Sequence, residues 1–121
     1  MLNLDTHILI HALAGDLEPH ESQLLRRHRH ARGISAIVLW EIAKLYEAGR
    51  INLSLEDPEL VEVLKEVQVW PISREVCLRI RDLDFQGDPA DELIAATSLA
   101  YRVPLLTRDA RILSSHKVPL A

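Results

Sequence analysis

Several acidic residues of this chain stand beside apolar segments, where carboxylates are uncommon. The segment GDPADELIAATSLA, Gly87 to Ala100, carries three acidic residues within five positions and then continues as an apolar, small-residue stretch. Asp5 follows the apolar start of the chain, and Asp109 follows a second apolar run near its end. Glu41 stands within the stretch AIVLWEIAKL. These acids are the side chains best suited to carry chemistry.

Carboxylates that converge within a few ångströms repel one another, and the pKa of some of them rises until they stay protonated. A divalent cation removes that repulsion. Mg²⁺ and Mn²⁺ prefer octahedral oxygen ligands, which a few acidic side chains supply together with water and substrate phosphate. Such ions activate water for phosphodiester hydrolysis. The acids that predict a cation site of this kind are Asp5, Glu41, Asp91 and Asp109.

Each acid also has a purely structural interpretation. Asp5, Asp88 and Asp109 each precede a predicted helix, where a carboxylate caps free backbone N–H groups. Asp91 stands three residues after Asp88, as the reciprocal acid of a capping box does, and also suits the first helical turn. Glu41 fits a solvated helix face, but an unpaired charge is costly to bury in a helix this apolar. A cation site is indicated by these acids occurring together, rather than by any one of them.

Short apolar segments alternate with longer helical patterns, which predicts an α/β fold with a parallel sheet. The predicted strands are residues 1–5, 33–35, 67–72, 102 to about 107–109, and 116–121. The predicted helices are Thr6–Ala14, Glu18–Arg32, 36–49, Glu56–Val67, Ser73–Leu83, a helix starting at Pro89, and a short one after Asp109. Parallel strands of such folds end at one edge of the sheet, where sites form. We therefore expect the acids at strand ends and in first helical turns to converge there.

The 121 residues predict one domain, residues 1–121. The composition, 48% hydrophobic and 26% charged, is typical of a soluble protein, and no apolar run reaches the roughly 18 residues of a membrane span. The start of the chain lacks the basic region of a secretory signal, so we expect a cytoplasmic protein without membrane association. The lone Cys77 cannot form an internal disulfide and is expected to be a buried thiol.

The net charge of −4 argues against a nucleic-acid partner, because phosphate binding is usually driven by basic surface. Setting the four candidate acids aside leaves equal numbers of acidic and basic residues. The dense basic run RRHRHAR, Arg26–Arg32, fits either a solvated helix face or a contact with an RNA backbone or partner.

His7 and His11 are four residues apart on a predicted helix, a spacing that allows two imidazoles to share a zinc ion. No third soft ligand stands near them in the sequence. Ordinary histidines on a helix face are therefore the favoured interpretation.

Four segments resemble the signature segments of PIN-domain ribonucleases, especially the VapC-type toxins of toxin-antitoxin pairs. They occur in the family's order across nearly the whole chain: LDTHILI, ISAIVLWEIAKL, GDPADELIAATSLA and VPLLTRDARI. The resemblance implies a PIN-like α/β/α sandwich with a short central parallel sheet. It also implies Mg²⁺- or Mn²⁺-dependent cleavage of RNA, a cognate VapB-type antitoxin and a homodimer.

Carried over by position, the resemblance implies that Asp5 and Asp91 are the principal metal ligands. Glu41 and Asp109 would complete the catalytic acids, directly or through water. Thr6 and Thr107 match hydroxyl positions that support the acidic pocket.

Two positions depart from the family pattern. Glu92 stands where members often carry Arg, which adds negative charge at the rim of the pocket and alters a supporting ion pair. His11 stands where many members carry Trp, and it either touches substrate or fills a polar gap.

Three other functions compete with the ribonuclease. An aspartyl phosphotransferase needs a second acid two residues after Asp5, where this chain has His7. A receiver-like signalling domain needs a lysine after a late strand, and the candidate Lys117 stands almost at the end of the chain. A catalytically silent PIN-like module that binds RNA or protein would keep the acids, so a metal-titration and cleavage assay separates it from the enzyme.

Overall fold

A single four-stranded parallel sheet lies at the centre of the molecule, in the order β3-β2-β1-β4. The computed structural model describes residues 1–121. The strands are β1 (Leu2–Leu4), β2 (Arg32–Ser35), β3 (Gln68–Trp70) and β4 (Leu105–Leu106). The register pairs Asn3 with Gly33 on one side and with Leu105 on the other. The predicted α/β fold with a short parallel sheet is confirmed.

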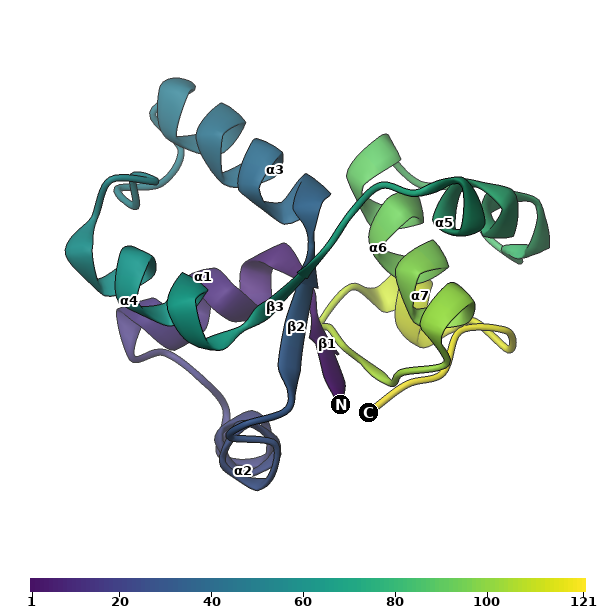
Figure 1. The fold of residues 1–121 in the computed structure, drawn as a ribbon, viewed down its shortest axis with the longest axis horizontal. Coiled ribbons are helices and arrows are strands. Elements are labelled where there is room, and N and C mark those ends of the chain that lie inside the picture. Colours follow the sequence, from purple (N-terminus) through teal and green to yellow (C-terminus); the bar gives the residue numbers. More distant parts are fainter.

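Helices cover both faces of the sheet, which gives the predicted α/β/α layers. They are α1 (Thr6–Ala14), α2 (Pro19–Arg27), α3 (Ala36–Glu47), α4 (Pro58–Glu66), α5 (Arg74–Arg79), the 3₁₀ helix η1 (Ile80–Asp82), α6 (Pro89–Tyr101) and α7 (Ala110–Leu113). Figure 1 shows α1, α3 and α4 on one side of the strands, α5, α6 and α7 on the other, and α2 below. None of these helices has the length and apolar character required to cross a bilayer.

The order of the strands creates a switch point beside β1. The chain builds β1, β2 and β3 side by side, and then returns through α5 and α6 to add β4 on the opposite side of β1. Connections therefore leave the carboxyl ends of β1 and β4 in opposite directions, and open α/β sheets form their ligand crevices at such a point. Asp5 and Asp109 follow these two strands.

The helix predicted for Glu18–Arg32 is shorter than expected and ends at Arg27. The chain must turn after Arg27 so that Arg32 can enter β2 opposite Leu2. The Arg32 guanidinium donates to the carbonyl of Leu25 through Nε at 3.1 Å and Nη2 at 2.6 Å, which satisfies a free carbonyl in the last turn of the helix. This long-range pairing overrides the helical pattern of residues 28–32.

Other element boundaries also differ from prediction. The helix predicted from Glu56 begins at Pro58, since proline suits the first helical position. The helix predicted for Ser73–Leu83 breaks into α5 and η1. The last predicted strand, residues 116–121, is reduced to one parallel bridge between Leu105 and Leu120.

Burial follows the expected faces at most positions, and Cys77 and Trp40 are exceptions. The small residues of α6, including Ala95, Ala96 and Ser98, are fully buried, as close packing of this helix requires. Cys77, predicted to be buried, is exposed, because Val76 is the residue of α5 that faces the core. Trp40, an apolar position of α3, is 51% exposed, with the ammonium of Lys44 5.8 Å from the centre of its ring.

Gly33 in β2 is required by the ring of Trp70 in the neighbouring strand. A Cβ at position 33 would lie 2.5 Å from two ring atoms of Trp70. This indole is 4% exposed and stacks on Tyr101 of α6, with ring centroids 5.7 Å apart. The bare backbone of Gly33 therefore lets one aromatic pair join the sheet to α6.

We expect Gly33→Ala to destabilise the fold by about 1–3 kcal/mol, because the added methyl overpacks a well-filled region. Chemical denaturation of the purified variant measures this change. Combining Gly33→Ala with Trp70→Leu should cost less than the sum of the single changes, since leucine removes the ring atoms that the methyl would meet. If the destabilisation of the double variant equals the sum of the two single variants, the clash between the methyl group and the ring is relieved in some other way.

Candidate functional site

Asp5 lies at the end of β1 and is 3% exposed. Its Oδ1 accepts the backbone N–H of Thr6 at 2.7 Å, which caps α1, and its Oδ2 accepts the hydroxyl of Thr107 at 2.5 Å. Burial raises the pKa of Asp5, and these two hydrogen bonds oppose the rise because they favour the carboxylate. Asp5 is thus both a cap, as its structural interpretation predicts, and a buried acid at the sheet edge.

Thr107 links Asp5 to Asp109. Its hydroxyl oxygen accepts the backbone N–H of Asp109 at 3.0 Å while it donates to Asp5. Asp109 Oδ1 accepts the N–H groups of Arg111 at 2.9 Å and Ile112 at 3.0 Å, so this residue is the N-cap of α7. Its Oδ2 makes no hydrogen bond within the chain and remains available as a ligand.

Asp88 and Asp91 begin α6. Asp88 Oδ1 accepts the N–H of Asp91 at 3.0 Å, which confirms Asp88 as the N-cap. The reciprocal bond of a capping box is not made by Asp91; instead, Glu92 Oε2 accepts the N–H of Gly87 at 3.1 Å. The Asp91 carboxylate is therefore free for another use. Glu92, which stands where family members often carry Arg, is thereby held against the loop that precedes α6.

Glu41 lies half-buried on α3, between exposed Trp40 and fully buried Ile42. Burial raises its pKa, the Thr6 hydroxyl opposes the rise, and the charges of Asp5 and Asp88 add to it. The Thr6 hydroxyl oxygen is itself buried without a hydrogen-bond partner of good geometry. A buried hydroxyl without a partner calls for an explanation, and its position beside the acid Glu41 is consistent with a site that binds a water molecule or an ion.

The four predicted acids form one electrostatic cluster. Burial and the charges of Asp88, Asp109, Asp5 and Glu41, in that order, raise the pKa of Asp91 from 3.8 to about 7. Burial is the largest cause of this rise, and the mutual repulsion of the carboxylates, which adds to it, is the part that a bound cation relieves.

Two members of the cluster were missed by sequence reasoning. Asp88, interpreted as a helix cap alone, also acts on Asp91 and Glu41 through its charge. The exposed His7 lowers the pKa of both Asp5 and Glu41, so it lies close to these acids. In the sequence, the position of His7 two residues after Asp5, at the start of a helix, could have indicated that it lies near the acids.

The donor set fits a hard divalent cation. No group of three or more His, Cys, Asp or Glu side chains is close enough to hold an ion by itself. Mg²⁺ does not require such a cage, since it keeps several waters and is commonly held by one or two carboxylates together with substrate phosphate. Asp5 and Asp91 suit that arrangement, since the charge of Asp5 is one of those that raise the pKa of Asp91.

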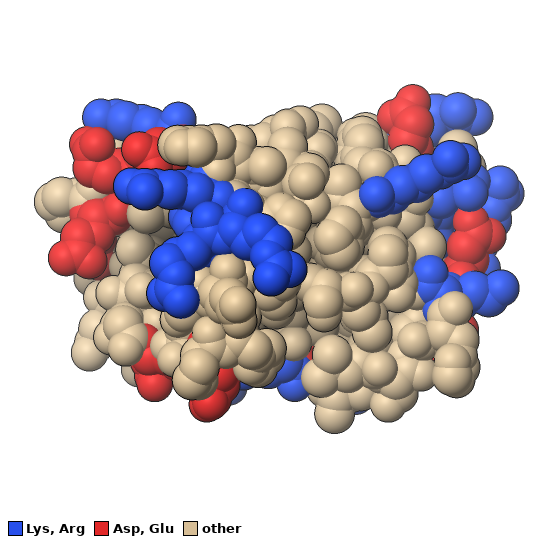
Figure 2. Space-filling view, turned by 90° about the horizontal axis from the view of Figure 1, so that it is seen from below, with Lys and Arg blue, Asp and Glu red and all other residues tan.

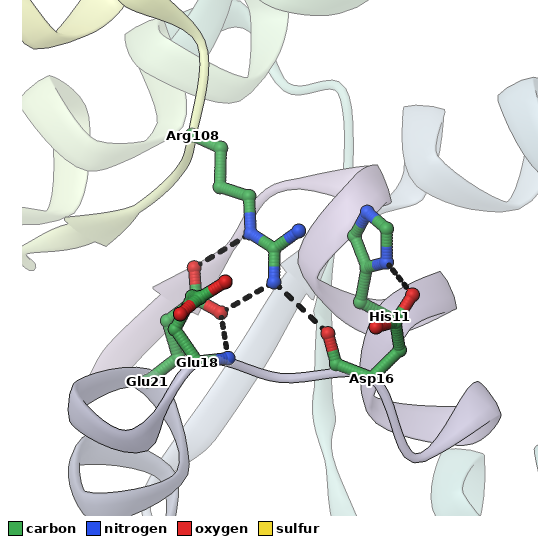
Figure 3. A network of polar contacts seen from close by, with 5 residues as sticks. All are labelled: His11, Asp16, Glu18, Glu21 and Arg108. Carbon is green, nitrogen blue, oxygen red and sulfur yellow. Dashed lines mark hydrogen bonds and ion pairs between the residues drawn. The ribbon is translucent and has the colours of Figure 1, made fainter.

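An ion pair between exposed Arg108 and buried Glu21, which the sequence did not predict, holds the loop after β4. Arg108 donates to Glu21 through Nε at 2.8 Å and Nη2 at 2.7 Å, and Nη2 also reaches the carbonyl of Asp16 at 3.1 Å (Figure 3). Glu21 is 1% exposed, and its Oε1 also accepts the N–H of Glu18 at 2.8 Å. Because Arg108 stands between Thr107 and Asp109, this pair fixes the segment that carries both residues.

The zinc interpretation of His7 and His11 is not favoured by their surroundings. His11 Nδ1 lies 3.2 Å from Asp16 Oδ2, in the same network as Arg108 (Figure 3). His7 instead lies near Asp5 and Glu41. The histidine at position 11 therefore fills a polar position between α1 and the loop that follows it.

The family model described as PIN domain matches residues 3–117. The chain belongs to the PIN domain family. It is 33% identical over 96 residues to "Ribonuclease VapC22" of Mycobacterium tuberculosis, an alignment that covers 76% of this chain and 72% of that relative.

Solved structures share the fold of this PIN domain. VapBC2 from Rickettsia felis, bound to a DNA fragment from its promoter, gives a TM-score of 0.74 at 19% identity, covering 100% of this chain and 98% of that chain. FitAcB from Neisseria gonorrhoeae gives a TM-score of 0.68 at 20% identity, covering 99% and 96%. At such identities the likeness establishes the architecture alone.

We expect Asp91→Asn to stabilise this PIN domain in metal-free buffer, and to do so more at about pH 8 than at about pH 5. The pKa of Asp91 is near 7 in the folded state and near 3.8 when unfolded, so the wild-type protein loses stability as pH rises between these values. Asparagine keeps the neutral form at every pH. Thermal unfolding with EDTA measures the difference, with Glu47→Gln on the exposed end of α3 as control. An equal effect of Asp91→Asn at both pH values would contradict the raised pKa.

We expect Glu21→Gln to destabilise the fold by about 2 kcal/mol at neutral pH, because it leaves Arg108 without its charged partner. The Arg108 hydrogen bonds lower the pKa of Glu21 from 4.5 to about 2. This stabilisation is therefore complete above about pH 4.5 and is lost as pH falls towards 2. Denaturation across this pH range should show the variant and wild type converging. The double variant with Arg108→Gln should cost little more than either single change.

Proposed function

We propose that this PIN domain is a Mg²⁺- or Mn²⁺-dependent endoribonuclease of the VapC type, the toxin of a toxin-antitoxin pair. The observation that carries the proposal is the convergence of the predicted acids at the switch point of the sheet, where their charges help to raise the pKa of Asp91. The 33% identity to a relative named as a ribonuclease supports RNA as the substrate. Asp5 and Asp91 are the proposed metal ligands, and Glu41 and Asp109 complete the catalytic acids.

The chain's own residues would each contribute a distinct part of the reaction. Asp5, held by Thr6 and Thr107, offers a carboxylate of fixed orientation. When bound, a divalent cation neutralises the cluster and lowers the pKa of a coordinated water. Glu41, whose pKa is raised by burial, would help to position a metal ion or the attacking water and would offer a carboxylate as proton acceptor. Asp109 Oδ2 faces no competing donor and positions water or metal.

The partners follow from the same family. We propose a VapB-type antitoxin that inhibits the enzyme and a homodimeric toxin. A structure of similar fold described as a toxin-antitoxin complex from Klebsiella pneumoniae supports this assignment. The rim of the pocket is acidic because Glu92 stands beside Asp91, so an arginine presented by an antitoxin would find carboxylates to pair with.

We expect purified protein, freed of any antitoxin, to cut RNA when Mg²⁺ or Mn²⁺ is present and to stop when EDTA is added. Asp5→Asn and Asp91→Asn should each abolish cleavage while leaving a folded protein, because each removes a charged oxygen ligand without changing side-chain volume. Gel analysis of total RNA and circular dichroism measure the two properties.

The matched control is Glu47→Gln, which removes one exposed carboxylate outside the cluster and should leave cleavage intact. Full activity of both aspartate variants would exclude the proposed ligands. Absence of cleavage by the wild-type protein with either metal would favour a silent PIN-like binding module.

A further inference from the structure

The basic run Arg26–Arg32, here called the basic segment, forms an exposed group of positive charges. It comprises the last turn of α2 and the turn that leads into β2. Arg26, Arg27 and Arg29 are all exposed, and none of them forms an ion pair. No acidic residue occurs in the sequence between Glu21 and Glu41.

The surroundings of the basic segment do not neutralise it. The pKa of His28 is lowered by burial and then by the positive charges of the N-terminal ammonium, Arg27 and Arg32. Burial and the charge of Arg29 lower the pKa of Arg32, and Glu66 of α4 is the acid that opposes this. These groups feel one another's positive charge, so the local potential is positive.

The basic segment lies at the edge of the sheet opposite the acidic cluster. Arg32 is paired with Leu2 at the start of β1, whereas Asp5 follows the end of the same strand. The N-terminus near His28 places the basic segment at the same edge. Figure 1 shows α2 below the strands, and Figure 2, seen from below, shows Lys and Arg side chains gathered over this part of the molecule. A ligand that touches both regions must therefore extend along the side of the domain.

We propose that the basic segment is a second RNA-contacting surface, which binds the phosphate backbone of the substrate away from the point of cleavage. This inference rests on the proposed ribonuclease function. The acidic cluster repels RNA until a cation is bound, so attraction at long range must come from elsewhere on the surface. Arginine suits the task because its planar guanidinium binds phosphate oxygens in pairs.

Composition favours RNA over an acidic polypeptide as the ligand. Arginines are common in protein interfaces, but there they lie in well-packed, desolvated pockets together with aromatic side chains. None of the large exposed hydrophobic side chains of this chain falls within residues 22–32; the nearest in sequence on either side are Met1 and Trp40 of α3. A surface of arginines without such anchors fits the backbone of a nucleic acid, whose binding is mainly electrostatic.

The test compares two variants with three arginines removed. The first is Arg26→Gln, Arg27→Gln, Arg29→Gln; the control is Arg50→Gln, Arg74→Gln, Arg81→Gln, which removes the same charge from exposed positions elsewhere. Both are made in the Asp5→Asn background to prevent cleavage, and thermal unfolding checks their folding. Binding to a long uridine homopolymer is measured by fluorescence anisotropy over a range of salt concentrations.

We expect the first variant to bind the long RNA at least about tenfold more weakly at low salt than the control. Its slope of log affinity against log salt should fall by about 2, from roughly 0.7 for each lost single-strand phosphate contact. Equal losses in the two variants would show a general charge effect and overturn the proposal, as would unchanged binding by the first. Binding of polyglutamate that is as tight as that of RNA and lost in the first variant would reassign the surface to acidic polypeptides.

Failure of this inference is separable from failure of the ribonuclease function. With Asp5 intact, the first triple variant should cleave a very short RNA as fast as wild type does, because such a substrate reaches the acidic cluster alone. Loss of that cleavage in a folded variant would place the arginines in the active site and overturn the proposal. If the wild-type protein binds RNA through the basic segment but never cuts it, the proposed ribonuclease activity is contradicted, whereas the basic segment is supported as an RNA-binding surface.

Discussion

The hydrogen bond from Thr107 to Asp5 is the contact on which the site depends. It joins two residues 102 positions apart and thereby fixes the ends of β1 and β4 against each other. A carboxylate as buried as Asp5 requires donors, and the Thr107 hydroxyl and the N–H of Thr6 supply them. The same hydroxyl accepts the N–H of Asp109, so one threonine orients acids from both strands. The site exists only once the sheet has closed on β4.

Contacts outside the acidic cluster counteract the repulsion within it. Arg108 and Glu21 hold the segment after β4, and Glu92 holds the loop that enters α6. Asn3, fully buried in β1, donates to the Ile94 carbonyl at 3.1 Å and to Ser98 Oγ at 2.9 Å, which ties α6 to the sheet. Functional sites commonly contain groups that repel one another, because contacts in the surrounding structure hold these groups in place.

The net charge of the chain conceals a separation of charge. Acids gather at the carboxyl edge of the sheet, where the strands end, and the basic segment lies at the opposite edge. A composition that argues against RNA binding is therefore compatible with it once position is known. The direction of the parallel strands causes this separation, since Asp5 and Arg32 are at opposite ends of paired strands.

Local patterns in the sequence were sufficient to predict the alternation of strands and helices, the capping residues Asp88 and Ser73, and the convergence of acids at one edge of the sheet. These depend on local periodicity and on residues a few positions apart, which a sequence displays directly. Three features became visible in the folded molecule alone: α2 ends at Arg27, Cys77 is exposed, and Glu21 pairs with Arg108, 87 positions away. Strand register and side-chain packing between distant segments set these features, and neither is encoded in the spacing of neighbouring residues.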